Sequence, residues 1–206
     1  MIAQTLSRRP ESPTEKRQAV EAAVLQAMEC LLAEGATYAT LSVERIAKRA
    51  GISRTAFYFY FADKRELLMR LASKLSDELY AEADAWWSGA GDGSEQLTAA
   101  LDKIAAVYRA HGPLVCAIVE LSTYDDVVGP FWQALVGRFV QASADRLSSE
   151  LEAGKTVAAA PEATAFALVW MTERTLHQMV VQDGGPPDDA LVRALADVWV
   201  ATVYGR

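Results

Sequence analysis

The chain contains few of the residues that build covalent, metal or catalytic sites. Its 206 residues include only two cysteines and two histidines. Cys30 and Cys116 each lie in an apolar stretch, which fits reduced, buried thiols and excludes a disulfide framework. His111 and His177 lie in different segments without metal-ligand spacing, and no zinc, nucleophile-elbow or phosphate-loop motif occurs. We therefore expect no enzyme: no catalytic residues, no metal and no cofactor.

Long apolar runs are also absent. No run reaches the roughly 18 residues of a membrane span, and the first ten residues, with Arg8 and Arg9, lack the apolar stretch of a signal peptide. Hydrophobic residues make up 51% of the chain and charged residues 23%, which is typical of an ordinary globular protein. We expect a soluble, cytoplasmic protein with no membrane partner.

Basic charge is scarce overall but unevenly distributed. The formal net charge is −7. Residues 1–75 contain 12 Lys and Arg against 8 Asp and Glu, a net charge of +4, whereas residues 76–206 contain 8 against 19, a net charge of −11. Such an asymmetry indicates an interaction surface in the basic part.

No alternating strand pattern bounded by hairpin turns occurs. Apolar residues instead recur at helical spacing in segments that end at Gly or Pro. The predicted helices are about 14–34, 42–50, 53–60, 64–87, 94–110, 114–123, 127–153, 161–182 and 188–204. The segment 127–153 fits either one long helix or a bent pair, and Asp63 with Glu66 resembles a capping box. The predicted fold class is all-α, with about nine helices.

The second and third of these helices predict a helix-turn-helix. Ser42 and Ser53 are suitable N-caps, and the turn between the helices contains Gly51, which tolerates a left-handed backbone. The short third helix would expose a set of side chains that suits a DNA major groove, where arginine can bind guanine. The set is Arg54, Thr55, Ala56, Tyr58 and Tyr60. For the two tyrosines, packing between the third and fourth helices is the alternative.

Phosphate contacts are predicted beside this helix. Ser42 and Ser53 begin helices, whose free N–H groups favour anions. Lys64 and Arg65 lie in the first turn of the fourth helix, where a cation is unfavourable toward the helix dipole. A DNA phosphate would compensate for this cost. A solvated charged turn is the alternative.

The C-terminal two thirds are rich in aromatic residues spread over several helices. Large flat side chains often line a cavity for an apolar ligand, although core packing would also account for them. Thr172 interrupts an apolar row, so its hydroxyl requires either a backbone carbonyl one turn back or a ligand. Glu173 and His177 are four residues apart, which favours a local pair.

Residues 41–68, LSVERIAKRAGISRTAFYFYFADKRELL, closely resemble the DNA-binding signature of the TetR family of bacterial repressors. The segments 171–176 (MTERTL) and 198–204 (VWVATVY) resemble the C-terminal part of the EthR-like (ethionamide-resistance regulator) subgroup. In that subgroup the corresponding helix displays polar amides into an elongated apolar tunnel, at the places that Val169 and Thr172 occupy here.

The resemblance implies a flexible tail (1–13), a helix-turn-helix DNA-binding domain (14–62) and a helical ligand-binding and dimerisation domain (63–206), connected by the helix at about 64–87. The residues expected at DNA are Ser42, Ser53, Arg54, Thr55, Ala56, Tyr58, Tyr60 and Lys64, and Lys64 matches the family's usual phosphate-contacting lysine. The residues expected around a ligand are Tyr108, Phe131, Trp132, Thr172 and Trp199.

The predicted function is therefore a homodimeric transcriptional repressor that pairs through its last two helices. Its partners would be double-stranded operator DNA and an apolar small-molecule effector that relieves operator binding. A ligand-sequestering or scaffolding helical protein is the alternative, because it would need the cavity but not the exposed surface around Arg54.

Overall fold

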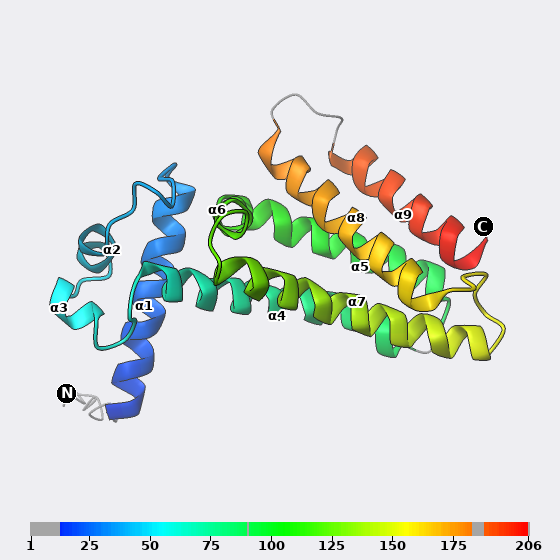
Figure 1. The fold of residues 1–206 in the computed structure, drawn as a ribbon, viewed down its shortest axis with the longest axis horizontal. Helices are drawn as coiled ribbons and strands as arrows, with labels where there is room; N and C mark the ends of the chain where they lie inside the picture. The colour runs from blue at the N-terminus through cyan, green and yellow to red at the C-terminus, as the bar shows by residue number, and fades with distance from the viewer. Residues whose placement is uncertain (1–12, 90, 183–187, 206) are drawn as a thin grey trace, which may run out of the picture. The chain divides into compact units, whose positions relative to one another are not determined.

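A computed structural model describes residues 13–89, 91–182 and 188–205. Over these ranges the backbone forms nine helices and no strand, which confirms the all-α prediction (Figure 1). They are α1 (Pro13–Ala33), α2 (Val43–Arg49), α3 (Arg54–Phe57), α4 (Lys64–Ser88), α5 (Gly93–Ala110), α6 (Gly112–Ser122), α7 (Val128–Glu152), α8 (Pro161–Val181) and α9 (Asp188–Tyr204). Residues 1–12 of the predicted tail lie outside the described residues, and Pro13 begins α1.

The chain divides into two compact units, one up to Leu67 and one from Leu68 on. The predicted division at residues 62 and 63 differs, because the first turn of α4 packs within the first unit. The Lys64 side chain donates to the carbonyls of Tyr38 and Leu41, and the side chain of Leu67 is fully buried.

Local capping fixes the helix-turn-helix. The Ser42 hydroxyl accepts a hydrogen bond from the Arg45 N–H at 3.2 Å, and the Ser53 hydroxyl accepts one from the Ala56 N–H at 3.0 Å. Between the two helices Gly51 has φ +72°, and the Ile52 N–H donates to the Ala47 carbonyl at 3.0 Å, closing a Schellman turn. Both predicted N-caps and the predicted glycine turn are therefore present.

Helix α3 is shorter than expected. It ends at Phe57, and Tyr58, Phe59 and Tyr60 form a turn in place of the predicted last helical turn. The N–H groups of Phe59 and Tyr60 donate three residues back, to Ala56 and Phe57. The tighter turn allows Phe61, which is 1% exposed, to enter the core beside Phe57, which is fully buried.

The second unit is a bundle in which α7 packs along α8 and α6, and α5 packs along α9 and α8. Figure 1 shows α8 and α9 side by side, with α6 crossing the other helices. The segment that fitted a long helix or a bent pair is one continuous helix, α7. In the described part of the chain no single helix is long and apolar enough to span a membrane; α5 and α6 meet the length and composition test only together, with an 85° bend between them.

Candidate functional site

The helix α3 and the turn after it present an exposed surface on the first unit. Arg54, Thr55, Tyr58 and Phe59 together line an open hollow. The Tyr58 side chain is 48% exposed and Phe59 is 79% exposed. Among the described residues the Arg54 guanidinium has no hydrogen-bond or ion-pair partner. A free guanidinium beside a hydroxyl and two aromatic rings can contact both phosphates and base edges.

The other side chains predicted to face DNA differ in how exposed they are. Ala56 and Tyr60 are half-buried, so they contribute less surface than Thr55 and Tyr58. The ring of Tyr58 meets that of Phe57 edge to face, with 5.5 Å between the centroids, while much of it stays in contact with solvent. Phe59 was missed by the sequence reasoning, although the five consecutive aromatic residues at 57–61 cannot all face the core.

Lys64 has partners within its own unit. Its ammonium donates to the backbone carbonyls of Tyr38 at 2.9 Å and Leu41 at 3.0 Å, and it lies 4.3 Å from the centroid of the Tyr38 ring. Partial burial lowers the pKa of Lys64. Two backbone carbonyls therefore offset the helix-dipole cost of this cation and tie α4 to the loop before α2, and the expected contact of Lys64 with a DNA phosphate stays a prediction.

Further positive charge lies on α2. Arg45 and Lys48 are both exposed, as is Arg49. The Arg49 guanidinium donates to the Glu34 carboxylate with an Nη1–Oε2 distance of 3.0 Å, and this hydrogen bond holds the pKa of Glu34 below its ordinary value. Arg45 and Lys48 were not among the predicted contact residues, but they add exposed positive charge on α2, the first helix of the helix-turn-helix.

The second unit encloses a cavity of about 90 Å³. Of the five predicted ligand residues, four line it: Tyr108, Trp132, Thr172 and Trp199. Phe131 does not, because a helix turns by about 100° per residue and Trp132 takes the inward position on α7. Aromatic residues that the prediction omitted, Trp86, Trp87 and Phe139, also line the cavity.

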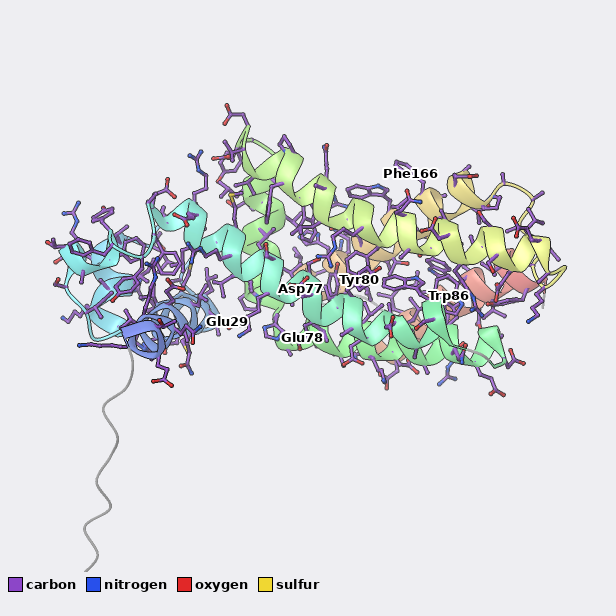
Figure 2. The ribbon with its side chains drawn as sticks, turned by 90° about the horizontal axis from the view of Figure 1, so that it is seen from below. Glu29, Asp77, Glu78, Tyr80, Trp86 and Phe166 are labelled. Carbon is purple, nitrogen blue, oxygen red and sulfur yellow. The ribbon has the colours of Figure 1, made fainter. Side chains whose placement is uncertain are left out.

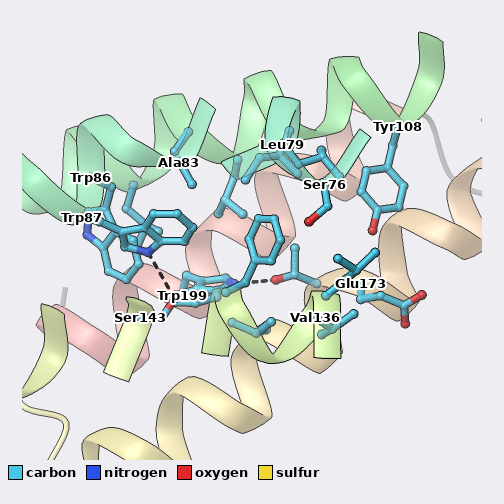
Figure 3. A pocket seen from close by; sticks show the side chains of 18 of the residues that line it. Ser76, Leu79, Ala83, Trp86, Trp87, Tyr108, Val136, Ser143, Glu173 and Trp199 are labelled. Carbon is cyan, nitrogen blue, oxygen red and sulfur yellow. Dashed lines mark hydrogen bonds between the residues drawn. The ribbon is translucent and has the colours of Figure 1, made fainter. Parts of the chain in front are cut away.

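Four polar side chains of the cavity are bonded to each other in two pairs (Figure 3). The indole N–H of Trp87 donates to the Ser143 hydroxyl at 3.3 Å. The indole N–H of Trp199 donates to the Thr172 hydroxyl at 2.8 Å, and that hydroxyl in turn donates to the Leu168 carbonyl at 2.8 Å. Of the two partners foreseen for Thr172, the backbone carbonyl one turn back is therefore the one present.

Glu173 is a buried carboxylate that lines this cavity, and it was not among the predicted ligand residues. Its side chain is 5% exposed, and neither carboxylate oxygen has a hydrogen-bond partner within the described residues. Burial raises the pKa of Glu173, and burial together with the nearby charge of Glu173 raises the pKa of Tyr108. The expected pair with His177 does not form, because the Nδ1 of His177 lies 3.4 Å from the Arg174 guanidinium instead.

A helix-turn-helix unit followed by a helical bundle with an apolar cavity is the architecture of a class of DNA-binding transcriptional regulators. The profile of the family described as bacterial regulatory proteins, tetR family, matches residues 26–71. The profile described as transcriptional regulator EthR, C-terminal domain, matches residues 97–205, more than half of the chain. The chain belongs to the TetR family of DNA-binding transcriptional regulators, with an EthR-type C-terminal domain.

Curated relatives and solved structures agree with this assignment. The HTH-type transcriptional regulator EthR of Mycolicibacterium smegmatis is 29% identical over 90% of this chain and 86% of the relative, and EthR of Mycobacterium tuberculosis is 26% identical over 90% and 88%. These relatives are transcriptional regulators, in agreement with the expectation that the chain is not an enzyme. SmeT, the repressor of the Stenotrophomonas maltophilia multidrug efflux pump SmeDEF, shares the fold with a TM-score of 0.73 at 20% identity, covering 92% of each chain. A regulator from Saccharomonospora viridis in complex with choline shares it with a TM-score of 0.74 at 16% identity, covering 94% of this chain and all of the other.

Proposed function

We propose that the protein is a homodimeric repressor that binds double-stranded operator DNA through residues 14–62 and releases it when a small molecule with a mainly apolar body enters the cavity of residues 63–206. The observation that carries the proposal is the exposed, unpartnered Arg54 on a helix that the TetR-family profile includes. Thr55, Tyr58 and Phe59 around it supply hydroxyl and apolar contacts of the kind that read base edges and thymine methyl groups.

The cavity supports the effector half of the proposal. Its walls are mostly aromatic and aliphatic side chains, which favour an apolar ligand body. Leu75, Leu79 and Trp86 line it from α4, the helix that begins at Lys64 in the first unit. A ligand that moves this wall acts on a helix continuous with the DNA-binding unit. The coupling between ligand and operator would be about 1–3 kcal/mol, as for most allosteric pairs.

Exposed apolar side chains on the last two helices support pairing with a second copy. Phe166 on α8 is 58% exposed and Val198 on α9 is 45% exposed. Figure 2 shows Phe166 at the outside of its unit, whereas Trp86 lies between the helices. Large apolar side chains at the surface of two adjacent helices suit a symmetric dimer, and an operator reader with one short recognition helix per chain needs two copies for sufficient contacts.

A gel-shift titration with the DNA that flanks the protein's own gene tests operator binding. Arg54→Ala should weaken specific binding by about 1–3 kcal/mol, roughly 5- to 150-fold, and relax the preference at one base position. Arg138→Ala is the matched control, because that exposed arginine on α7 pairs with Asp77 and lies over the Tyr80 ring, both in the second unit. Absence of any salt-sensitive, sequence-preferring shift would favour the sequestering or scaffolding alternative.

Analytical ultracentrifugation at micromolar concentration tests the assembly. The wild type should sediment as a dimer, and the double variant Phe166→Asp with Val198→Asp should sediment as a folded monomer with weakened operator binding. A wild-type monomer, or a double variant that stays dimeric, would contradict pairing through α8 and α9.

A further inference from the structure

The cavity has one end whose polar groups are paired and one end whose polar groups are not. Figure 3 shows Ser143 with Trp86 and Trp87 at the first end, and Ser76, Tyr108 and Glu173 at the other. At the first end the Ser143 hydroxyl and the Trp87 indole are bonded to each other. At the other end the Ser76 hydroxyl and both oxygens of Glu173 are buried without a hydrogen-bond partner among the described residues.

These groups are unusual for a folded core. Buried hydroxyls and carboxylates are nearly always hydrogen-bonded, because a polar atom removed from water without a partner destabilises the fold. Among the described residues the cation beside Glu173 is Arg174, whose Nε lies 3.9 Å from Oε2, beyond hydrogen-bond distance, on a side chain that is 58% exposed. Arg174 therefore leaves Oε1 unpaired and satisfies Oε2 only weakly.

The residues that carry the unpaired groups come from two helices and line the same cavity. Ser76 is on α4 and Glu173 is on α8, and both line the cavity with Tyr108 of α5. All three accept hydrogen bonds, and the carboxylate is the one acid that lines the cavity. A ligand group that donates several hydrogen bonds and carries positive charge would satisfy what the protein leaves unsatisfied.

We propose that the cavity selects an amphiphilic amine, whose protonated nitrogen donates to the Ser76 hydroxyl and the Glu173 carboxylate while its apolar chain lies toward Trp86 and Trp87. This inference rests on the proposed function, because it names the chemical class of the effector. It adds to the apolar effector a positively charged head group at a defined end of the cavity. It also assigns the recognition of the ligand to Glu173, next to Thr172, which the sequence analysis predicted as a ligand contact.

Binding of matched eight-carbon probes to the full-length protein tests the proposal. Octylamine, 1-octanol and octanoate share one chain and differ in head group, and their binding is measured by isothermal titration calorimetry and by quenching of tryptophan fluorescence. Octylamine should bind at least tenfold more tightly than 1-octanol, and octanoate should bind most weakly because its charge repels Glu173. Equal binding of octylamine and 1-octanol, or tighter binding of octanoate, would overturn the proposal.

Three variants assign the preference to its residues. Glu173→Gln keeps the shape of the side chain and removes its charge, so it should lower octylamine affinity at least tenfold and leave 1-octanol affinity within about twofold. Ser76→Ala should lower octylamine affinity severalfold. Ser143→Ala, at the opposite end, should leave the ratio of octylamine to 1-octanol affinity unchanged. A Glu173→Gln protein that keeps the wild-type ratio would refute the role of the carboxylate.

Operator release in the same gel-shift assay separates this inference from the proposed function. If 1-octanol binds and releases the operator as well as octylamine does, the amine preference is refuted while effector-relieved repression stands. If no probe binds and the operator complex is unaffected, the amine proposal is refuted, while the operator complex itself still supports the DNA-binding half of the proposed function. If octylamine binds with the expected preference but leaves the operator bound, the head-group site is supported and the coupling to DNA is refuted.

Discussion

The buried carboxylate of Glu173 makes a specific prediction about stability. Its side chain is 5% exposed, its two oxygens lack hydrogen-bond partners within the described residues, and the Arg174 Nε is 3.9 Å away. Burial raises the pKa of Glu173 above its ordinary value, and the charge of Arg174 offsets this only in part. Glu173→Gln removes the ionisable group and keeps its volume, so the variant should be more stable than the wild type whenever the carboxyl would be ionised.

The sign of the pH dependence follows from the raised pKa. Below about pH 4.5, the ordinary pKa of a glutamate, both the folded and the unfolded chain hold the proton, and the charge has no effect on stability. As the pH rises above this value the unfolded chain ionises first, so the wild type loses stability until the folded carboxyl also ionises. The advantage of Glu173→Gln should grow from near zero at about pH 4 to roughly 1–3 kcal/mol at about pH 8, the cost of an unsatisfied buried polar group.

Thermal unfolding followed by circular dichroism measures this difference. For a chain of this size, 1 kcal/mol corresponds to about 2–4 °C, so Glu173→Gln should raise Tm at the higher pH by about 2–12 °C. Glu162→Gln is the control on the same helix. Glu162 lies in the first turn of α8, where an ionised carboxylate is favourable by about 0.3–1 kcal/mol, so its removal should act in the opposite direction. A Glu173→Gln protein less stable than the wild type at pH 8, or a difference that does not change with pH, would refute the reasoning.

Three further substitutions test the local geometry. Gly51→Ala should destabilise the first unit by about 1–2 kcal/mol, as measured by urea denaturation, because φ at this position is +72°. No atom lies within 4 Å of the new methyl group, so backbone strain accounts for the whole loss of stability. Lys64→Met should lower the free energy of unfolding by about 1–3 kcal/mol, because two carbonyls lose a charged donor. Unchanged stability, together with a flatter salt dependence of operator binding, would instead indicate that Lys64 contacts a DNA phosphate. Thr172→Val should lower the free energy of unfolding by about 1–3 kcal/mol, because it leaves the Trp199 indole N–H unpaired. An unchanged Tm would show that water replaces the hydroxyl.

Features that depend on neighbouring residues were predicted well from the sequence. The N-caps at Ser42 and Ser53, the left-handed Gly51 and the pair of Asp63 with Glu66 each depend on residues within four positions of one another. The Glu66 N–H donates to Asp63 at 2.8 Å, and the Glu66 carboxylate accepts from the Ala62 N–H at 2.6 Å. Turn and capping chemistry is local, so a single sequence contains the information that specifies it.

Features that depend on tertiary contacts were predicted less well. The partners of Lys64 lie 23 and 26 residues away, so the sequence showed an uncompensated cation but not the carbonyls that compensate it. Phe131 and Trp132 are both aromatic, and only the rotation of α7 decides which of them faces the cavity. Glu173 was predicted to pair with His177, four residues further on, because the spacing alone does not reveal that the rest of the bundle covers this side of the helix.

The persistence of the cavity follows from how its tryptophans are held. The indole N–H groups of Trp86, Trp87 and Trp199 donate to Tyr204, Ser143 and Thr172, each on another helix. Closing a cavity of about 90 Å³ would gain roughly 2 kcal/mol at about 24 cal/mol per Å³. Turning one indole into the space would leave its buried N–H without a partner, at a cost of about 1–3 kcal/mol. Because this cost is comparable to the gain from closing the cavity, the bundle keeps a site that a ligand can enter without first breaking these bonds.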